Sequence, residues 1–138
     1  MFRLRSLLAA TVVTRSQVEE LVKKKLANDN SVKYTMLVDV RSYDEVRSSG
    51  KIATAINIPL NSLSFVLSRE CSPADFYEAY SVEKPKPASH HLIFYCEHGV
   101  RSATAANVAE DFGFTSVSNY PGSWSEWSRV HPPQSKPT

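Results

Sequence analysis

The clearest indication of the fold comes from one segment, His91-Leu-Ile-Phe-Tyr-Cys-Glu-His-Gly-Val-Arg-Ser102. Its first five residues, 91–95, are largely apolar and aromatic and predict a buried strand. After the loop 96–101, an Ala-rich segment from Ser102 to Phe112 predicts a helix. Gly113 is expected to end this helix, because glycine is favoured at the first position after a helix C-cap. A strand that passes through a tight loop directly into a helix is the repeating unit of α/β proteins with parallel sheets.

Segments on both sides continue this alternation. Short apolar runs predict three more strands, at 36–40, 55–58 and 116–120. Helices are expected at 17–27 behind a Ser16–Glu19 capping box, at 42–49 behind a second capping box, and at 75–80. We expect an extended loop between Pro59 and Ser72, and a final short helix or turn around Trp124 and Trp127. The chain is therefore predicted to be an α/β protein, with a mainly parallel central sheet and helices on both faces.

Composition fits one ordinary soluble domain, since 42% of the 138 residues are hydrophobic and 22% are charged. Two cysteines, Cys71 and Cys96, without a secretory signal predict free thiols in a reducing compartment. The formal net charge of +2 is too small to predict nucleic-acid binding. No run approaches the ~18 apolar residues of a membrane-spanning helix. We expect a monomer with no membrane and no nucleic-acid partner.

The two ends of the chain differ in composition from the middle. Residues 1–15 contain arginine, serine and threonine but no acidic residue, which fits a transit peptide and predicts mitochondrial localisation. The alternative is a flexible arm on a cytoplasmic protein. Residues 131–138 are rich in proline and predict a disordered tail. The folded domain is expected to span residues 16–130.

Cys96 is the candidate nucleophile because it follows the carboxyl end of a strand, where open parallel sheets form their sites. The loop from Glu97 to Val100 leads into a helix, so several backbone N–H groups are expected to turn inward as an anion-binding nest. Gly99 allows a positive φ in that loop, and Arg101 adds a fixed positive charge. These groups favour a thiolate, which could attack an electrophilic sulfur atom and then carry it as a persulfide in the same ring of donors.

The chain resembles the rhodanese (thiosulfate sulfurtransferase) family over roughly residues 16–128, and looks most like its eukaryotic single-domain members of the thiosulfate–glutathione sulfurtransferase type. Four segments carry the resemblance in order: Asp39-Val-Arg41 with Glu45, Gly50 to Pro59, Cys96-Glu-His-Gly-Val-Arg101 as Cys-x-x-Gly-x-Arg, and Tyr120-Pro-Gly-Ser-Trp-Ser-Glu-Trp127. Two positions depart from the family pattern, since Lys51 and Thr54 stand where His and Gly are frequent.

The resemblance implies an enzyme without a cofactor or metal. It would move a sulfane sulfur from a donor such as thiosulfate, through a persulfide on Cys96, to a thiol such as glutathione or to cyanide. Cys96 and Arg101 would be catalytic, and the remaining loop residues would surround the substrate: Glu97, His98, Gly99, Val100 and Ser102. Asp39, Arg41 and Glu45 are expected to hold strand and loop together, Asn57 to pin a neighbouring loop, and both tryptophans to pack in the core.

Three other functions are possible for a cysteine in such a loop. A phosphatase of the protein-tyrosine type would have five residues between cysteine and arginine, whereas four intervene here. A non-catalytic or redox-sensing binding module of the same fold is the second alternative, with Cys71 as a partner for an oxidised Cys96. A metal site involving Cys96, His98 and the His90–His91 pair lacks the usual spacing of zinc ligands. The resemblance also leaves the identity of the sulfur donor open, because Glu97 and His98 stand where many thiosulfate-using members of the family carry basic residues.

Overall fold

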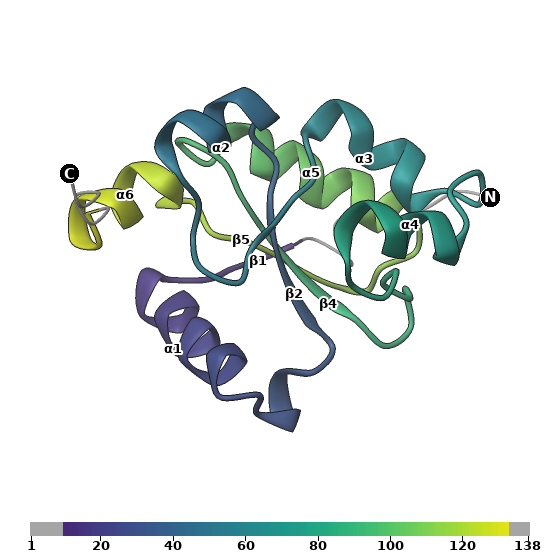
Figure 1. Ribbon diagram of the computed structural model, residues 1–138, viewed down its shortest axis with the longest axis horizontal. Helices are drawn as coiled ribbons and strands as arrows, with labels where there is room; N and C mark the ends of the chain where they lie inside the picture. The colour runs from purple at the N-terminus through teal and green to yellow at the C-terminus, as the bar shows by residue number, and fades with distance from the viewer. Residues whose placement is uncertain (1–9, 133–138) are drawn as a thin grey trace.

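A parallel sheet forms the centre of the molecule (Figure 1), in a computed structural model that describes residues 10–132. Within those residues the sheet has five strands in the order β1-β5-β4-β2-β3, all parallel. Their bounds are β1 Thr11–Val12, β2 Thr35–Asp39, β3 Ile56–Asn57, β4 His91–Tyr95 and β5 Ser116–Asn119. The two longest strands, β2 and β4, lie side by side at the centre, which places the segment after β4 in the middle of the carboxyl edge of the sheet.

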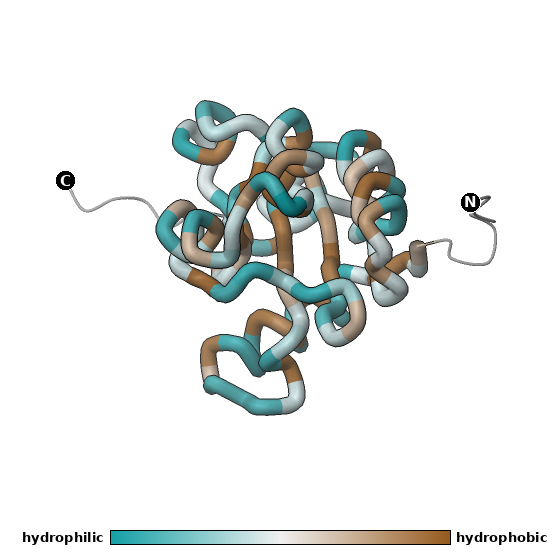
Figure 2. Tube along the Cα trace, turned by 90° about the vertical axis from the view of Figure 1, so that its right-hand side faces the viewer, coloured by the Kyte–Doolittle hydropathy of each residue, from teal (hydrophilic) through white to brown (hydrophobic). Residues whose placement is uncertain are grey.

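Helices cover both faces of this sheet, as predicted. One face carries α3 (Leu60–Leu67), α4 (Pro73–Tyr80) and α5 (Val100–Asp111), and the other carries α1 (Arg15–Leu26) and α6 (Ser123–Val130). The short α2 (Tyr43–Ser49) and the 3₁₀ turn η2 (Asn30–Val32) lie in the connections. Figure 2 shows hydrophobic segments running through the interior and hydrophilic segments outside. The predicted fold class is therefore confirmed.

Alternation along the central strands divides the core into two clusters. Val38 and Phe94 point to the face covered by α3, α4 and α5, while Leu37 and Ile93 point to the face covered by α1 and α6. Because successive side chains of a strand point to opposite faces, Cys96 falls on the same side as Phe94. The cysteine is thereby directed toward α5, the helix that begins at the end of its own loop.

The structure differs from the prediction most at α1, β1 and α3. Helix α1 begins at Arg15, and its capping box is formed by Thr14 and Gln17 rather than by Ser16 and Glu19. The chain enters that helix from the short strand β1, whose pairing with β5 continues to a hydrogen bond from Val13 N–H to the Asn119 carbonyl (3.0 Å). The predicted extended loop 60–71 is wrong in its first part, because α3 occupies residues 60–67 and buries Leu63, Val66 and Leu67.

The ends of the domain lie further out than residues 16 and 130. Thr11 and Val12 form the edge strand β1, so the sheet begins inside the segment expected to be a transit peptide or arm. At the other end, the His131 ring stacks on Trp127 with 4.3 Å between centroids and lies 2.6 Å from Glu19. Residues 1–9 and 133–138, which hold most of the predicted leader and tail, lie outside the described residues. Within residues 10–132 no helix is long and apolar enough to cross a membrane.

Candidate active site

The Cys96 thiol lies inside the loop between β4 and α5, and the residue is only 1% exposed. Its Sγ accepts hydrogen bonds from the backbone N–H of Gly99 (3.1 Å) and of Ser102 (3.4 Å). The Ser102 hydroxyl lies 3.4 Å from the same sulfur. The loop therefore forms the nest of donors that the sequence predicts, with the sulfur at its centre.

Two opposing effects set the pKa of the Cys96 thiol. Burial raises this pKa, because it penalises the charged thiolate. The Ser102 hydroxyl and the backbone N–H groups of Ser102, Gly99 and His98 lower it by donating to the sulfur, and together they outweigh burial. The pKa of Cys96 is thus lowered, which raises the thiolate fraction at neutral pH and with it the reactivity of the residue.

The start of α6 orients the backbone of the active loop. Trp124 N–H donates to the Cys96 carbonyl (2.9 Å), and Ser125 N–H donates to the Glu97 carbonyl (3.0 Å). The Ser123 hydroxyl accepts from Cys96 N–H (3.2 Å) and donates to the Tyr120 carbonyl (2.8 Å). With the first carbonyls of the loop held from outside, the later N–H groups are free to point inward at Sγ.

Ser123 is a functional residue that the sequence analysis missed. It is fully buried and has a φ of 56°, in the left-handed region that residues with a side chain rarely adopt. Ser123 lies 27 positions after Cys96 in the sequence, so no local pattern indicates that its hydroxyl binds the active loop.

Gly99 is required where it stands. Its φ is 91°, and a Cβ atom at this position would lie 2.7 Å from the carbonyl oxygen of Pro121 and 3.0 Å from its Cα. Both contacts are shorter than van der Waals distances and involve backbone, which cannot move aside easily. A glycine therefore allows the segment before α6 to approach the active loop closely, and the predicted positive φ is confirmed.

Arg101, the predicted catalytic cation, is held by Glu45. The guanidinium binds the carboxylate in a bidentate pair, with Nη1–Oε1 at 2.7 Å and Nη2–Oε2 at 3.0 Å. The hydrogen bond from Arg101 lowers the pKa of Glu45 to about 2, helped by the Ser42 donors and opposed by partial burial. The Arg101 side chain is still 38% exposed, so donor atoms remain available at the surface of the site.

A buried cation, Arg41, organises the rear of the site as expected for a structural residue. It is 0% exposed and forms three contacts with the Asp39 carboxylate, the shortest from Nη2 at 2.7 Å. Its remaining donors reach the Ser49 hydroxyl (2.8 Å) and the Gly50 carbonyl (2.7 Å). Burial would lower the pKa of Arg41, but the Asp39 carboxylate raises it, so the guanidinium stays charged.

The Glu97 carboxylate also belongs to this cluster. It lies 3.7 Å from Arg41 Nη1, while the Arg41 guanidinium stacks over the Trp124 ring at 4.9 Å. Asn57 completes the arrangement by donating to the carbonyls of Asp39 (3.0 Å) and Arg41 (2.9 Å). The acidic residue that seemed to count against an anionic donor is thus paired with a buried positive charge.

The remaining predicted residues have separate places. His98 is exposed on the loop, and Val100 is 75% exposed at the first turn of α5. Cys71 is buried in the core cluster, and its Sγ contacts the Ser72 carbonyl at 3.8 Å. No group of three or more His, Cys, Asp or Glu side chains arranged to hold a metal occurs within residues 10–132.

Comparison with known proteins agrees with this geometry. A model of the rhodanese-like domain matches residues 18–130. Human thiosulfate:glutathione sulfurtransferase is 43% identical over 91 residues, 66% of this chain and 76% of the relative. The mitochondrial thiosulfate sulfurtransferase RDL2 of Saccharomyces cerevisiae is 38% identical over 119 residues, 86% of this chain and 73% of the relative. The solved structure of the human single-domain sulfurtransferase TSTD1 superposes with a TM-score of 0.73 at 33% identity, covering 91% of this chain and 99% of that one.

The predicted resemblance, fold and enzyme class are confirmed by these matches. The matched region includes β2 to α6 and all of the loop around Cys96. The chain belongs to the rhodanese-like domain family.

Proposed function

We propose that this protein transfers a sulfane sulfur from thiosulfate, through a persulfide on Cys96, to glutathione. The observation that carries the proposal is the set of donors on Cys96 Sγ, from Gly99 N–H, Ser102 N–H and the Ser102 hydroxyl. The human relative is named for this pair of substrates, and the yeast relative RDL2 for thiosulfate. Donor and acceptor are small molecules that reach a sulfur at the carboxyl edge of the sheet.

The first half-reaction is a displacement at sulfur. The Cys96 thiolate attacks the outer sulfur of thiosulfate, an S–S bond forms, and the S–S bond of thiosulfate breaks. Sulfite leaves with the bonding electron pair. The product, Cys–S–S⁻, carries its charge one atom further from the backbone, where the same inward-pointing donors stabilise it.

The second half-reaction restores the thiolate. Glutathione thiolate attacks the outer sulfur of the persulfide, the bond to Cys96 Sγ breaks, and glutathione persulfide leaves. Cys96 departs as a thiolate, and its lowered pKa makes it a good leaving group. Cyanide can replace glutathione in this step and would give thiocyanate.

Arg101 acts on the anionic substrate from the rim of the loop. Two guanidinium nitrogens, Nη1 and Nη2, each donate one hydrogen bond to the Glu45 carboxylate, which fixes the side chain. The remaining N–H groups of the guanidinium can donate to the sulfonate oxygens of thiosulfate. A hollow beside it, lined by Val40, Leu60 and Asn61, continues the site toward α3 and offers room for the acceptor.

A sulfite-release assay tests the mechanism. With thiosulfate and no acceptor, the wild-type protein should release one sulfite per molecule in a burst and then stop. Addition of glutathione should restart release. The Cys71→Ser variant should give the same burst, and Cys96→Ser none. Continuous release without an acceptor would contradict the persulfide intermediate, and a burst from Cys96→Ser would place the sulfur on another residue.

Two further proposals concern the protein in the cell. We propose that it is imported into mitochondria, as the name of RDL2 states for that relative, and that it acts as a monomer. Deletion of residues 1–9 from a fluorescent fusion tests import without removing strand β1, which begins at Thr11. Unchanged organelle targeting would contradict a role for these residues. Sedimentation velocity tests the oligomeric state, and a dimer at micromolar concentration would contradict the second proposal.

A further inference from the structure

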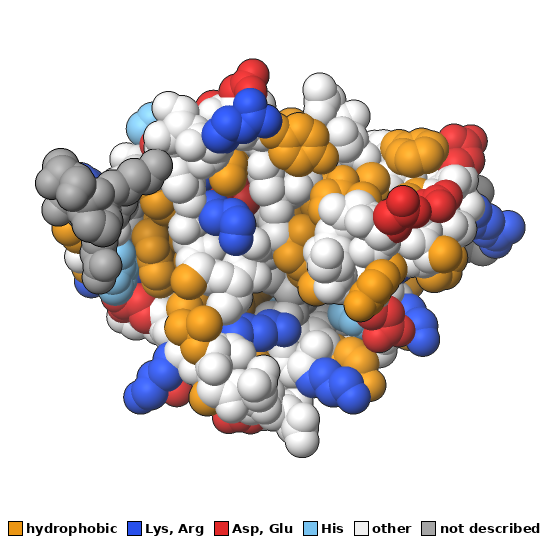
Figure 3. All heavy atoms as spheres, viewed as in Figure 1, with side chains coloured by type: hydrophobic (Ala, Val, Ile, Leu, Met, Phe, Trp, Pro, Cys, Tyr) orange, Lys and Arg blue, Asp and Glu red, His pale blue; other side chains and the backbone are white. Residues whose placement is uncertain are grey.

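A cavity of about 230 Å³ lies at the opposite end of the sheet from Cys96. Thr35, the first residue of β2, and His90, which precedes β4, both line it. Cys96 lies six positions beyond His90 along the same strand, so at ~3.3 Å per residue the two sites are about 20 Å apart. Figure 3 shows a hollow in the face between α1 and α4, with basic side chains and a histidine at its edge.

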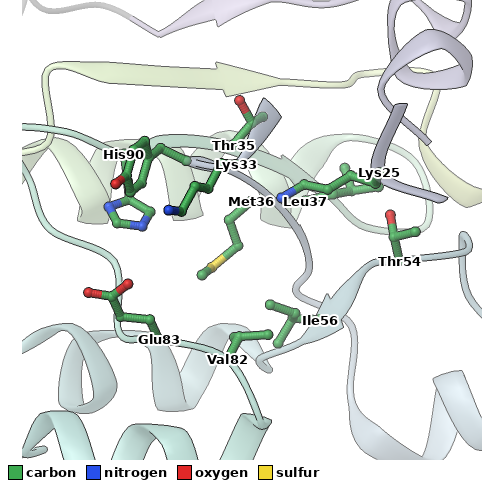
Figure 4. Close-up of a pocket in the computed structure, with 11 residues that line it drawn as sticks. Lys25, Lys33, Thr35, Met36, Leu37, Thr54, Ile56, Val82, Glu83 and His90 are labelled. Atoms are coloured by element: carbon green, nitrogen blue, oxygen red, sulfur yellow. The ribbon is translucent and has the colours of Figure 1, made fainter. Parts of the chain in front are cut away.

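Two lysines direct positive charge into this cavity. Lys25, in the last turn of α1, and Lys33, after η2, extend toward the space around Met36 (Figure 4). Neither ammonium group has a carboxylate within 4.0 Å among residues 10–132. Burial lowers the pKa of Lys25, as expected for a desolvated cation without a counter-charge.

Thr54, on another side of the cavity, has two unfavourable features. Its φ is 72°, a left-handed conformation that is strained for a β-branched residue. Its hydroxyl oxygen is buried and has no hydrogen-bond partner. Buried polar groups almost always have a hydrogen-bond partner in proteins. A buried hydroxyl without one, on the wall of a cavity, therefore indicates that a ligand in the cavity supplies the partner.

Most of the other lining residues are apolar or aromatic, and they are joined by a histidine and one carboxylate. Met36, Ile56 and Val82 present an apolar surface. His90 Nδ1 accepts from Lys86 N–H (2.9 Å), so the neutral ring carries its proton on Nε2 and can donate. The one carboxylate on the wall, Glu83, is paired with Lys86 at 3.5 Å. A ligand that fits must therefore carry negative charge at one end and an apolar body at the other.

We propose that this cavity binds a small organic anion. Lys25, Lys33 and the Thr54 hydroxyl bind its carboxylate or phosphate head group, and a short aliphatic body packs on the apolar wall. The volume is below the range of about 300–1,000 Å³ that accommodates drug-sized ligands, so the body is limited to a few carbon atoms. The site is separate from the sulfur-transfer loop and does not depend on the proposed function.

Methyl NMR tests this proposal directly, because Met36 is one of only two methionines in the chain. Protein labelled with ¹³C on the methionine methyl groups is titrated with isovalerate and with isobutyl phosphate, which share a body and differ in head group. The Met36 signal, assigned with Met36→Leu, should move saturably with at least one of the two. Isovaleramide and inorganic phosphate, each lacking one half of the ligand, should bind at least tenfold more weakly.

Matched variants locate the site. Lys25→Gln and Lys33→Gln should each raise the dissociation constant about tenfold, whereas Lys23→Gln, an exposed change of the same charge in the same helix turn, should leave it unaltered. Thr54→Val keeps the shape but removes the orphan hydroxyl, so it should raise the melting temperature of the free protein while weakening binding.

Several results would overturn the proposal. They are the absence of a saturable shift with either anion at millimolar concentration, equal binding of isovaleramide, equal binding of inorganic phosphate, or equal weakening by Lys23→Gln. Because the readout is the Met36 signal, none of them depends on sulfurtransferase activity.

Discussion

Removal of the Ser102 hydroxyl should raise the pKa of Cys96 and lower its thiolate fraction about tenfold at a pH below that pKa. Ser102→Ala deletes the hydroxyl donor at 3.4 Å from Sγ but keeps the backbone N–H of the same residue at 3.4 Å and that of Gly99 at 3.1 Å. A hydrogen bond to a charged group contributes roughly 1.5–3 kcal/mol, and we take the lower end because sulfur accepts weakly. A free-energy loss of about 1.4 kcal/mol corresponds to a factor of ten in the thiolate fraction.

The shift is measured from the pH dependence of Cys96 alkylation by iodoacetamide, followed by intact mass in a Cys71→Ser background. Thr104→Ala, an exposed change in the same helix, serves as the control. Below its pKa the variant should hold about tenfold less thiolate, and kcat/KM for thiosulfate should fall by a similar factor. An unchanged pKa, or an equal change in Thr104→Ala, would refute the claim that the loop donors stabilise the thiolate.

Three further changes probe other parts of the site. Gly99→Ala places a Cβ 2.7 Å from the Pro121 carbonyl oxygen at a φ of 91°. The variant should lower the free energy of unfolding by about 2 kcal/mol, measured by urea titration, and should lower kcat/KM about 100-fold. Wild-type values for both would contradict the close approach of the two backbone segments. Arg101→Ala should impair turnover and raise the pKa of Glu45 from about 2 toward its ordinary value in carboxyl ¹³C NMR, with the Ser42 donors still lowering it in part. Most of the stability that this carboxylate contributes above pH ~4.5, and that the wild type loses as the pH falls toward 2, should then disappear. A Glu45 pKa that stays near 2 would show that Arg101 is not its cause. Cys71→Ser should keep turnover while lowering the melting temperature, because a buried thiol is replaced by a hydroxyl, and loss of turnover would make Cys71 a participant.

Local signals predicted most of the fold. The apolar run at 91–95 matches β4 residue for residue, and the Ser42–Glu45 capping box matches the start of α2, which ends at Gly50. Both features depend on neighbouring residues alone, so the local sequence is sufficient to predict them. The nest around Cys96 was predicted for the same reason, since a strand, a short loop and a helix in succession leave few alternative paths for the backbone.

The incorrect predictions concern helix boundaries that are determined by contacts with distant segments of the chain. Thr14–Gln17 and Ser16–Glu19 fit the capping box equally well, and the pairing of β1 with β5, more than 100 positions away, selects the first. Helix α3 begins after Pro59 without a side-chain cap, so its start has no local mark. Apolar residues at helical spacing in 60–67 were the available signal, and the serines between them obscured it.

The same limit applies to the site. Arg101 was predicted as the cation near the thiolate, but its bidentate partner Glu45 lies 56 positions earlier. Glu97 was an open question, because its pairing with Arg41 depends on a strand far away in the sequence. Sequence reasoning thus identified the reactive sulfur and its loop, while the ion pairs that orient the loop required the folded structure.

Detection of the persulfide on Cys96 tests the proposed sulfur transfer without relying on turnover. Intact-protein mass spectrometry should be applied to the wild type and to Cys96→Ser after incubation with thiosulfate, and again after addition of glutathione. The mechanism requires one added sulfur atom on the wild type alone, located at Cys96 by peptide mapping and removed by glutathione. A wild type that takes up no sulfur from thiosulfate, or a Cys96→Ser variant that does, would contradict it.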